Sequence, residues 1–148
     1  MALFKRARKL KSTHGNFDQW GDGYPFPDFV ADWVRRGEMY VVTRDGDIVG
    51  TFAAFTKYAE YDGADLGWLN EDPYICIGAF ALESVDELGI IKNIIKWCAE
   101  RTDNIRVDTG VKNFAAQYML KKHGFEHVGT FIPTYENATE MIAFHLVL

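Results

Sequence analysis

The segment from residue 74 to residue 109 constrains the fold of this chain more than any other. The run YICIGAFAL at 74–82 is almost continuously apolar, which is typical of a strand covered on both faces. From Gly89 to about Arg101, apolar residues recur at helical spacing, and IRVDT at 105–109 follows as a second short strand. A strand, a helix and a strand of these lengths predict two parallel strands with a right-handed crossover.

Shorter elements surround this unit, and together they predict one mixed sheet with helices on its faces. In chain order they are a helix at 2–12, a short helix between Pro27 and Gly37, a hairpin that turns at Asp45-Gly46, a helix from Val111 to His123, and two strands within 125–132 and 139–148. No repeat or linker interrupts them. We therefore expect residues 1–148 to form a single domain.

Two loops carry aromatic side chains that are candidates for substrate contact. The segment STHGNFDQWGDGYPFP holds Trp20 and Tyr24, which are too apolar to stand free in water and so are expected to lie on the core and line a pocket. The polar segment at 58–73 is rich in acids and contains Trp68. This second loop either attracts a cationic amine or is a solvated surface loop.

The composition favours a folded, soluble protein. Hydrophobic residues make up 48% of the 148, and the net charge of −5 argues against nucleic acid or an anionic membrane as the main partner. The basic run FKRARKLK at 4–11 is an exception, which is either a solvated helix face or a tail that binds RNA or lipid. No apolar run approaches the ~20 residues of a membrane span, and no signal peptide is recognisable, so a cytoplasmic location is expected.

The residue types that hold metals or act as nucleophiles show no diagnostic spacing. The four histidines form no metal-binding motif, so no metal is expected, and the sequence patterns of serine hydrolases and of nucleotide-phosphate loops are absent. Cys76 and Cys98 are either two buried small apolar side chains or a disulfide.

The segment RVDTGVKNFAAQYMLKKHGF, residues 106–125, carries a resemblance to a known family. It resembles the second half of the GCN5-related N-acetyltransferases (GNAT), in the strand with Asp108 and Thr109, in Asn113, and in the closing Gly124-Phe125. The segments DQWGDGYP and GEMYVVTRDGDIVG are similar to the early helix-loop region and the first hairpin of that family. The resemblance runs from about Trp20 to Phe131.

The resemblance implies an α+β fold and an N-acetyltransferase that moves an acetyl group from acetyl-coenzyme A to an amine of a small molecule or peptide. It implies that the pantetheine arm pairs with the backbone of Phe80, Ala81 and Leu82. It further implies pyrophosphate near Leu88, Gly89, Ile90 and Ile91, and a coenzyme contact from Asn113. The amine needs a base, for which Glu83 and Asp108 are the candidates; a structural role is the alternative for each carboxylate.

The turn LESVDELGIIKN, residues 82–93, departs from the family pattern. A strand followed by a turn and a helix N-terminus is suited to an anion, yet Asp86 and Glu87 stand where the family has other residue types, and Ile91 replaces a small one. The motif is therefore degenerate, and the alternative role of the two acids is to cap the helix. Leu120 occupies the position of a tyrosine that often protonates the leaving thiolate.

These departures leave a second hypothesis open. The chain begins in a predicted helix, without the usual first strand of the family, so the N-terminal edge strand is either absent or replaced. An open sheet edge is a surface on which another chain can pair, as in a homodimer. The alternative function is accordingly a non-catalytic binding or oligomerisation module with the same fold.

Overall fold

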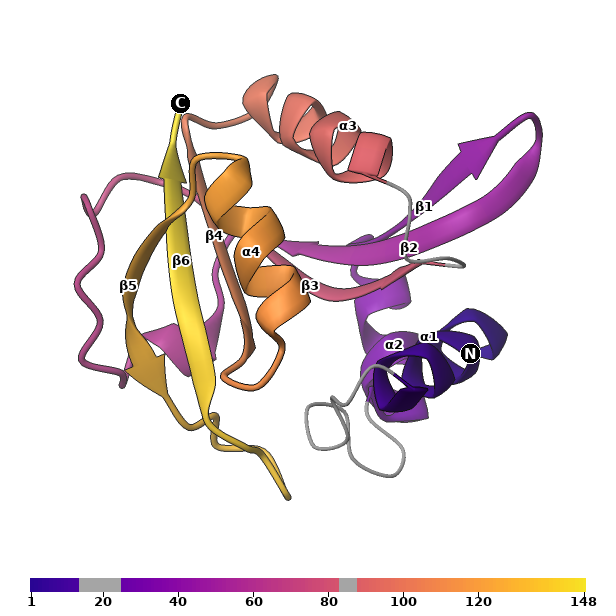
Figure 1. The fold of residues 1–148 in the computed structure, drawn as a ribbon, viewed down its shortest axis with the longest axis horizontal. Coiled ribbons are helices and arrows are strands. Elements are labelled where there is room, and N and C mark those ends of the chain that lie inside the picture. The colour runs from indigo at the N-terminus through magenta and orange to yellow at the C-terminus, as the bar shows by residue number, and fades with distance from the viewer. Residues whose placement is uncertain (14–24, 83–87) are drawn as a thin grey trace.

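The fold is that of a six-stranded mixed sheet with helices on both faces (Figure 1). The computed structural model describes residues 1–13, 25–82 and 88–148. In chain order the elements are α1 (Ala2–Thr13), α2 (Pro27–Arg35), β1 (Met39–Arg44), β2 (Asp47–Phe55), η1 (Ala59–Tyr61), β3 (Ile75–Leu82), α3 (Leu88–Ala99), β4 (Asn104–Gly110), α4 (Phe114–Lys122), β5 (Glu126–Phe131) and β6 (Met141–Val147). None of the helices in these ranges is long and apolar enough to span a bilayer.

The strands lie in the order β1-β2-β3-β4-β6-β5, and β3 with β4 forms the one parallel pair among them. This confirms the parallel pair predicted for residues 74–109. The edge strand beside β2 is β1, and among the described residues no further strand lies beyond it.

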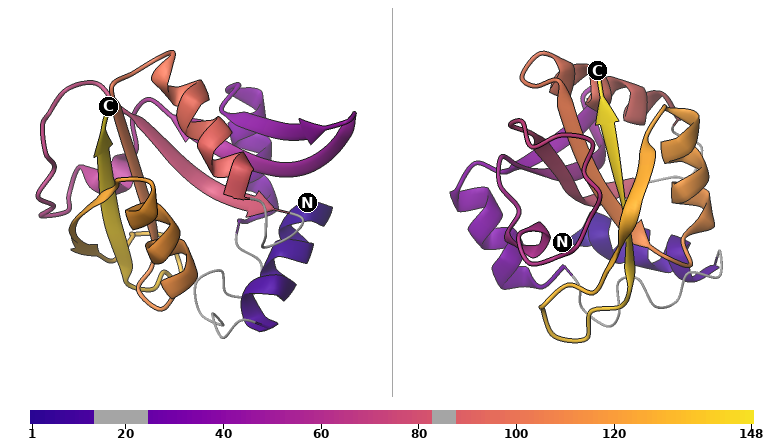
Figure 2. Two further views of the ribbon diagram at one scale, coloured as in Figure 1. Left: turned by 45° about the horizontal axis from the view of Figure 1, so that its top comes forward. Right: turned by 90° about the vertical axis from the view of Figure 1, so that its left-hand side faces the viewer.

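The parallel pair is short, and its two strands separate toward their C-terminal ends (Figures 1 and 2). Pairing covers Ile75 with Ile105, Cys76 with Arg106, and Ile77 with Val107. Beyond Ile77 the backbone of β3 turns away, because Ala79 adopts a φ of 46°, a conformation that an L-residue with a side chain takes only at a cost of about 1 kcal/mol or more. A gap therefore opens between the second halves of β3 and β4.

Local sequence signals account for most element boundaries. Asp45 and Gly46 have φ values of 52° and 86°, so the predicted tight turn joins β1 and β2 as expected. The helix predicted from Val111 is shorter, because the side chain of Asn113 accepts a hydrogen bond from the Ala116 N–H and caps α4. The correction is that residues 111–113 lead into the helix and do not belong to it.

The core has two main layers, one on each face of the sheet. On one face α3 packs its Ile90, Ile94 and Cys98 against the strands, while on the other face Cys76 lies among aromatic side chains. Helix α1 covers that second face through Phe4 and Ala7 against Ala81 of β3. Because the two cysteines lie on opposite faces and are both free thiols, the disulfide alternative is wrong.

The loop at 58–73 lies at the surface as predicted, and buried polar groups fasten it to the sheet. The Arg106 side chain, 4% exposed, donates to the Asn70 carbonyl oxygen at 2.7 Å and stacks between the rings of Trp68 and Tyr74. The Leu69 N–H donates to Nδ1 of His145, which therefore carries its proton on Nε2 and donates it to Asn104 Oδ1 at 3.0 Å. These bonds hold the loop in one position.

Gly129 of β5 lies against Leu66 of this loop, and it provides a test of the packing. Its φ is 146°, and a Cβ there would stand 2.8 Å from the Leu66 side chain. We expect Gly129→Ala to lower the free energy of unfolding in urea by about 1–3 kcal/mol. Gly63→Ala, where a Cβ meets open space, is the control and should change it by less than about 0.5 kcal/mol. Equal effects of the two substitutions would contradict the described contact.

Candidate functional site

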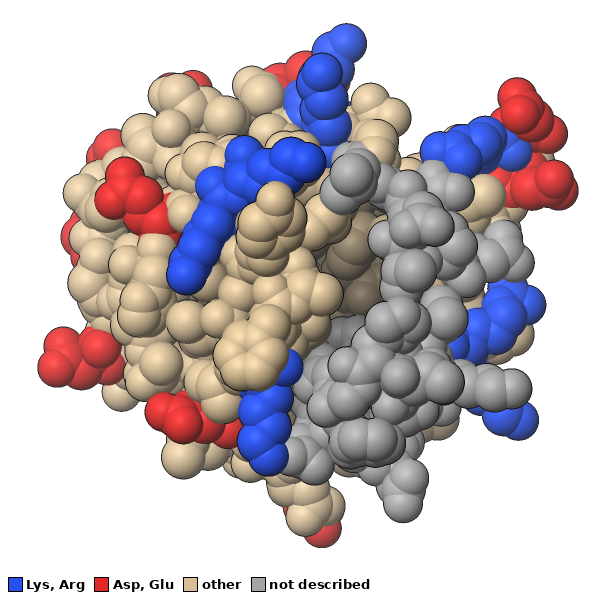
Figure 3. Space-filling view, in the orientation of Figure 1, with Lys and Arg blue, Asp and Glu red and all other residues tan. Residues whose placement is uncertain are grey.

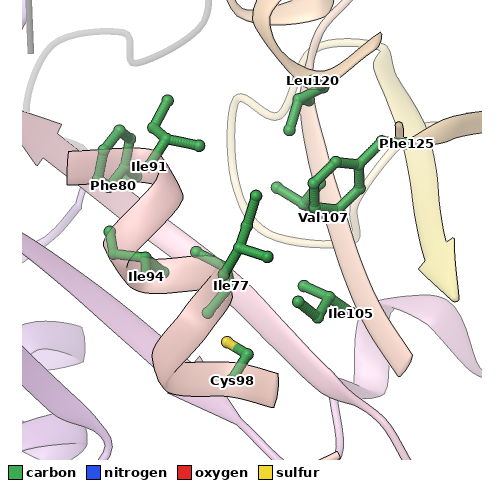
Figure 4. Close-up of a pocket in the computed structure, with 10 residues that line it drawn as sticks. Ile77, Phe80, Ile91, Ile94, Cys98, Ile105, Val107, Leu120 and Phe125 are labelled. Carbon is green, nitrogen blue, oxygen red and sulfur yellow. The ribbon is translucent and has the colours of Figure 1, made fainter. Parts of the chain in front are cut away.

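An apolar pocket lies in the gap between β3 and β4, on the face that α3 and α4 cover (Figure 4). The side chains from β3, β4, α3 and α4 point toward one another around it. The lining residues are Ile77, Phe80, Ile91, Ile94, Ile95, Cys98, Ile105, Val107, Leu120 and Phe125. A cavity volume of about 70 Å³ exceeds the ~10–15 Å³ that one water needs and suits a slender chain entering from outside.

The backbone of Phe80, Ala81 and Leu82 borders this pocket. On the side of this segment that faces away from β2, no described strand pairs with it. Ala81 and Leu82 pair with Thr51 and Gly50 of β2, whereas pairing with β4 has already ended. Buried or half-buried backbone groups need partners, so this side of β3 is suited to an extended ligand that binds as a strand does. The structure thus places the three residues predicted to contact pantetheine at the gap.

Helix α3 begins at Leu88, next to the end of β3. Ile90 is buried in the core, while Ile91 faces the pocket (Figure 4). A Cβ added to Gly89 would meet open space, so the first turn of the helix is accessible at this point. The predicted residues Glu83, Asp86 and Glu87, and the loop residues Trp20 and Tyr24, lie outside the described residues.

The helices beside the pocket are basic although the whole chain is acidic. The sequences of α3 and α4 contain four lysines and no acid. Figure 3 shows blue side chains over both helices on this face. The lysines are Lys92, Lys96, Lys121 and Lys122. A ligand that carries several negative charges would be attracted here more than the net charge of −5 suggests.

Asn113 connects β4 to α4. Besides capping the helix, it donates from its side-chain nitrogen to Thr109 Oγ1 at 3.0 Å. A direct contact of Asn113 with coenzyme stays a prediction. On α4, Leu120 lines the pocket, whereas Tyr118 is 68% exposed.

Asp108 directly follows Val107, the last β4 residue that pairs with β3, and its side chain lies on the face opposite the pocket. Its Oδ2 accepts a hydrogen bond of 2.7 Å from the hydroxyl of Tyr61. Burial raises the pKa of Asp108 to about 6, the Tyr61 hydrogen bond opposes this rise, and the charge of Glu60 adds to it. Asp108 is half-buried as a residue, and its carboxyl has a pKa suited to proton transfer near neutrality.

Two further ionisable groups face Asp108. Glu60 accepts hydrogen bonds from the N–H and hydroxyl of Thr134, at 2.7 Å and 2.9 Å. Burial, with the charges of Asp108 and Glu60, raises the pKa of Tyr135 to about 12. Among the described residues, no positively charged group is a cause of the pKa shift of Asp108.

Trp68 is predicted to contact substrate. The centroid of its ring lies 4.8 Å from that of Tyr61 and 5.8 Å from that of His145. Sequence reasoning proposed Asp108 as a candidate base, which stays a prediction, and did not single out Tyr61, because a tyrosine in a polar loop gives no periodic signal that marks it as buried. Within 1–13, 25–82 and 88–148, no three His, Cys, Asp or Glu side chains are grouped so as to hold a metal ion.

Comparison with solved structures identifies the fold. A GNAT-family acetyltransferase from Streptococcus agalactiae matches 100% of this chain and 87% of its own, with a TM-score of 0.80 at 23% identity. A GNAT-family acetyltransferase from Listeria monocytogenes matches 99% of this chain and 86% of its own, with a TM-score of 0.69 at 18% identity. An acetyltransferase from Bacillus subtilis in complex with CoA matches 84% of this chain and 86% of its own, with a TM-score of 0.61 at 15% identity.

No family model and no curated protein matches the sequence. At these identities the structural likeness establishes the fold. The α+β fold predicted from residues 106–125 and from the order of elements is confirmed as a GNAT fold.

The pKa shifts of Asp108 and His145 predict opposite effects on stability. Burial, with the charge of Arg106, lowers the pKa of His145 to about 4, so between about pH 6.5 and 4 the unfolded chain binds a proton that the folded protein does not. Stability from His145 is thus lost as pH falls. For Asp108, between about pH 6 and 4 the folded protein binds a proton that the unfolded chain does not. The contribution of Asp108 to the free energy of unfolding therefore rises as pH falls.

We expect His145→Asn, which keeps an acceptor for the Leu69 N–H, and Asp108→Asn to change the pH dependence in opposite directions. Measured in urea at about pH 7.5 and about pH 4.5, the stability of His145→Asn relative to the unsubstituted protein should rise with acidification by an amount on the order of 2 kcal/mol. That of Asp108→Asn should fall by a similar amount. Changes of the same sign in both variants would contradict the assignments.

Proposed function

We propose that the protein is an N-acetyltransferase that uses acetyl-coenzyme A and a primary amine of a small molecule or peptide. The observation that carries this proposal is the gap between β3 and β4, which has an apolar pocket beneath basic helices on one face and a carboxyl group on the other. The solved structures with this fold that are named above are acetyltransferases, and one of them contains CoA.

The pocket fits the thioester end of the coenzyme. The pantetheine arm is extended, carries amide groups and ends in sulfur. It therefore suits a narrow apolar pocket bordered by the side of Phe80 to Leu82 that does not pair with β2. The phosphates would lie toward the start of α3, where the helix dipole and Lys92 attract negative charge.

The amine would approach from the face of the sheet on which Asp108 lies. Its lone pair attacks the thioester carbonyl carbon, the N–H proton passes to the Asp108 carboxylate, and backbone N–H groups of β3 stabilise the negative oxygen that forms. Collapse of the intermediate breaks the carbon–sulfur bond and releases the coenzyme thiolate. Asp108 then returns its proton to solvent.

Some features of the site remain predictions. Glu83 is the second candidate for the base, and Trp20, Tyr24 and Trp68 are candidates for contact with the acceptor. We also retain a cytoplasmic location and a homodimer that pairs through the β1 edge.

Coenzyme binding at the pocket is tested with a matched pair of tryptophan substitutions on α3. Ile91→Trp fills the pocket, whereas Asn93→Trp places the same residue two positions on, on an exposed part of the helix. By calorimetry, we expect Ile91→Trp to weaken acetyl-coenzyme A binding more than about tenfold, a loss of ~1.4 kcal/mol. Asn93→Trp should leave the dissociation constant for acetyl-coenzyme A within about threefold of that of the unsubstituted protein.

Circular dichroism melts of both variants would show whether either has lost its fold. No binding to the unsubstituted protein at millimolar acetyl-coenzyme A would contradict the proposal itself and favour the non-catalytic alternative. Equal weakening by the two substitutions would place the coenzyme elsewhere.

The base is tested by the pH dependence of turnover. With a panel of primary amines and detection of the released thiol, kcat/KM calculated for the concentration of unprotonated amine should rise to a plateau above about pH 6, because Asp108 must be ionised to accept a proton. Asp108→Asn should lower kcat/KM about 100-fold or more. If Glu83→Gln abolishes turnover while Asp108→Asn leaves it intact, the base is Glu83.

A further inference from the structure

Tyr61 lies at the end of η1 and reaches the same face of the sheet as Asp108. Its side chain is only 4% exposed, and its hydroxyl lies 2.7 Å from Oδ2 of Asp108, 47 residues away in sequence. An ionised carboxylate has no proton to donate, so the tyrosine is the donor. The bond is therefore charge-assisted whenever Asp108 is ionised.

A second hydrogen bond fixes the tyrosine hydroxyl from behind. The thiol of Cys76, on the neighbouring strand β3, donates to the Tyr61 oxygen at 3.4 Å. The thiol is fully buried, and burial raises its pKa well above the ordinary value, so it stays protonated and keeps donating. The tyrosine hydroxyl thus accepts from one strand and donates to the next.

Packing locks the tyrosine ring in the orientation that this chain of bonds requires. The ring centroid lies 4.9 Å from that of Tyr58, 4.8 Å from that of Trp68 and 5.6 Å from that of Phe131. Trp68 is held in turn by Arg106, whose guanidinium stacks on it at 4.2 Å. These contacts, together with the two hydrogen bonds, restrict the movement of the Tyr61 hydroxyl.

We infer that Tyr61 is the positioning residue of Asp108: its hydroxyl holds one carboxylate oxygen in place, so that the other is presented to the proton of the acceptor amine. The inference rests on the proposed function for the identity of that proton. Among the described residues, no hydrogen-bond donor contacts Oδ1 of Asp108. One oxygen is thus anchored and the other is available.

The groups that face Asp108 determine what removal of the hydroxyl would do. They are Tyr61 and Glu60 from η1, Tyr135 from the turn before β6, and Cys76 from β3. Among them, the Tyr61 hydroxyl lowers the pKa of Asp108, whereas burial and the charge of Glu60 raise it. Loss of the hydroxyl should therefore move the pKa of Asp108 upward from about 6.

The experiment is an NMR titration of the Asp108 carboxyl carbon in Tyr61→Phe, in the protein without ligand. Tyr74→Phe is the control, since the Tyr74 ring lies 6.4 Å from that of Tyr61 on the same face and its hydroxyl bonds to the Tyr58 N–H. We expect the Asp108 midpoint to rise by about half a pH unit or more in Tyr61→Phe and to stay in place in Tyr74→Phe. An unchanged midpoint in Tyr61→Phe would overturn the inference.

This readout separates the inference from the proposed function, because it needs no turnover. Where acetyl transfer is measured, the acid limb of kcat/KM should move upward by the same amount as the NMR midpoint. A raised midpoint in a protein that never transfers acetyl groups would contradict the proposed function and confirm the bond between Tyr61 and Asp108.

A second measurement applies if Tyr61→Phe does not fold. In the unsubstituted protein at about pH 7.5, above the Asp108 midpoint, the carboxyl carbon should shift when H₂O is replaced by D₂O, because a deuteron then occupies the Tyr61 bond. The absence of any isotope shift would show that no proton is shared with the carboxylate and would likewise overturn the inference.

Discussion

The structure depends on the early end of the pairing between β3 and β4. Three residue pairs join the strands, and the left-handed backbone at Ala79 then directs β3 away. The separation leaves the side of Phe80 to Leu82 that faces away from β2 without a partner among the described strands, and it opens a pocket toward α3 and α4. It also brings Asp108, the first β4 residue after the last pair, to the border of the gap. One interruption of the sheet thus provides a place for a ligand and a carboxyl beside it.

The loop at 58–73 completes the site because it is held by interior polar contacts. Arg106 stacks between two aromatic rings, and His145 stays neutral so that it can accept from Leu69 and donate to Asn104. Burying a charged arginine is costly unless it is compensated, so these contacts fix the loop in a single register. The consequence is that Tyr61 meets Asp108 at hydrogen-bond distance.

The order of elements and the positions of the parallel strands were predictable, because a buried strand, an amphipathic helix and a tight turn each have a local signature in YICIGAFAL, IIKNIIKWC and Asp45-Gly46. The start of α4 was predicted too early, at Val111, whereas the capping by Asn113 begins the helix at Phe114. The contact between Tyr61 and Asp108 was not predictable. It joins a polar loop to a strand through long-range packing, and no pattern in either segment specifies the other.

The pocket residues illustrate the same limit. Ile91 stood out in the sequence as a departure from the family pattern, and the structure shows that its side chain lines the gap. The positive character of α3 and α4 was hidden by the net charge of the whole chain and emerged only when both helices were seen to flank one pocket. The net charge sums the charges of the whole chain, whereas a ligand contacts only one part of the surface.

The central claim is that the separated half of β3 receives an acyl-coenzyme as a further strand-like partner. The most direct test is amide hydrogen exchange by NMR with and without saturating acetyl-coenzyme A. The account predicts slower exchange at backbone amides within Phe80–Leu82, with no change at the β1 edge around Val41 and Val42. Unchanged exchange at Phe80, Ala81 and Leu82 in a coenzyme-saturated sample would contradict it.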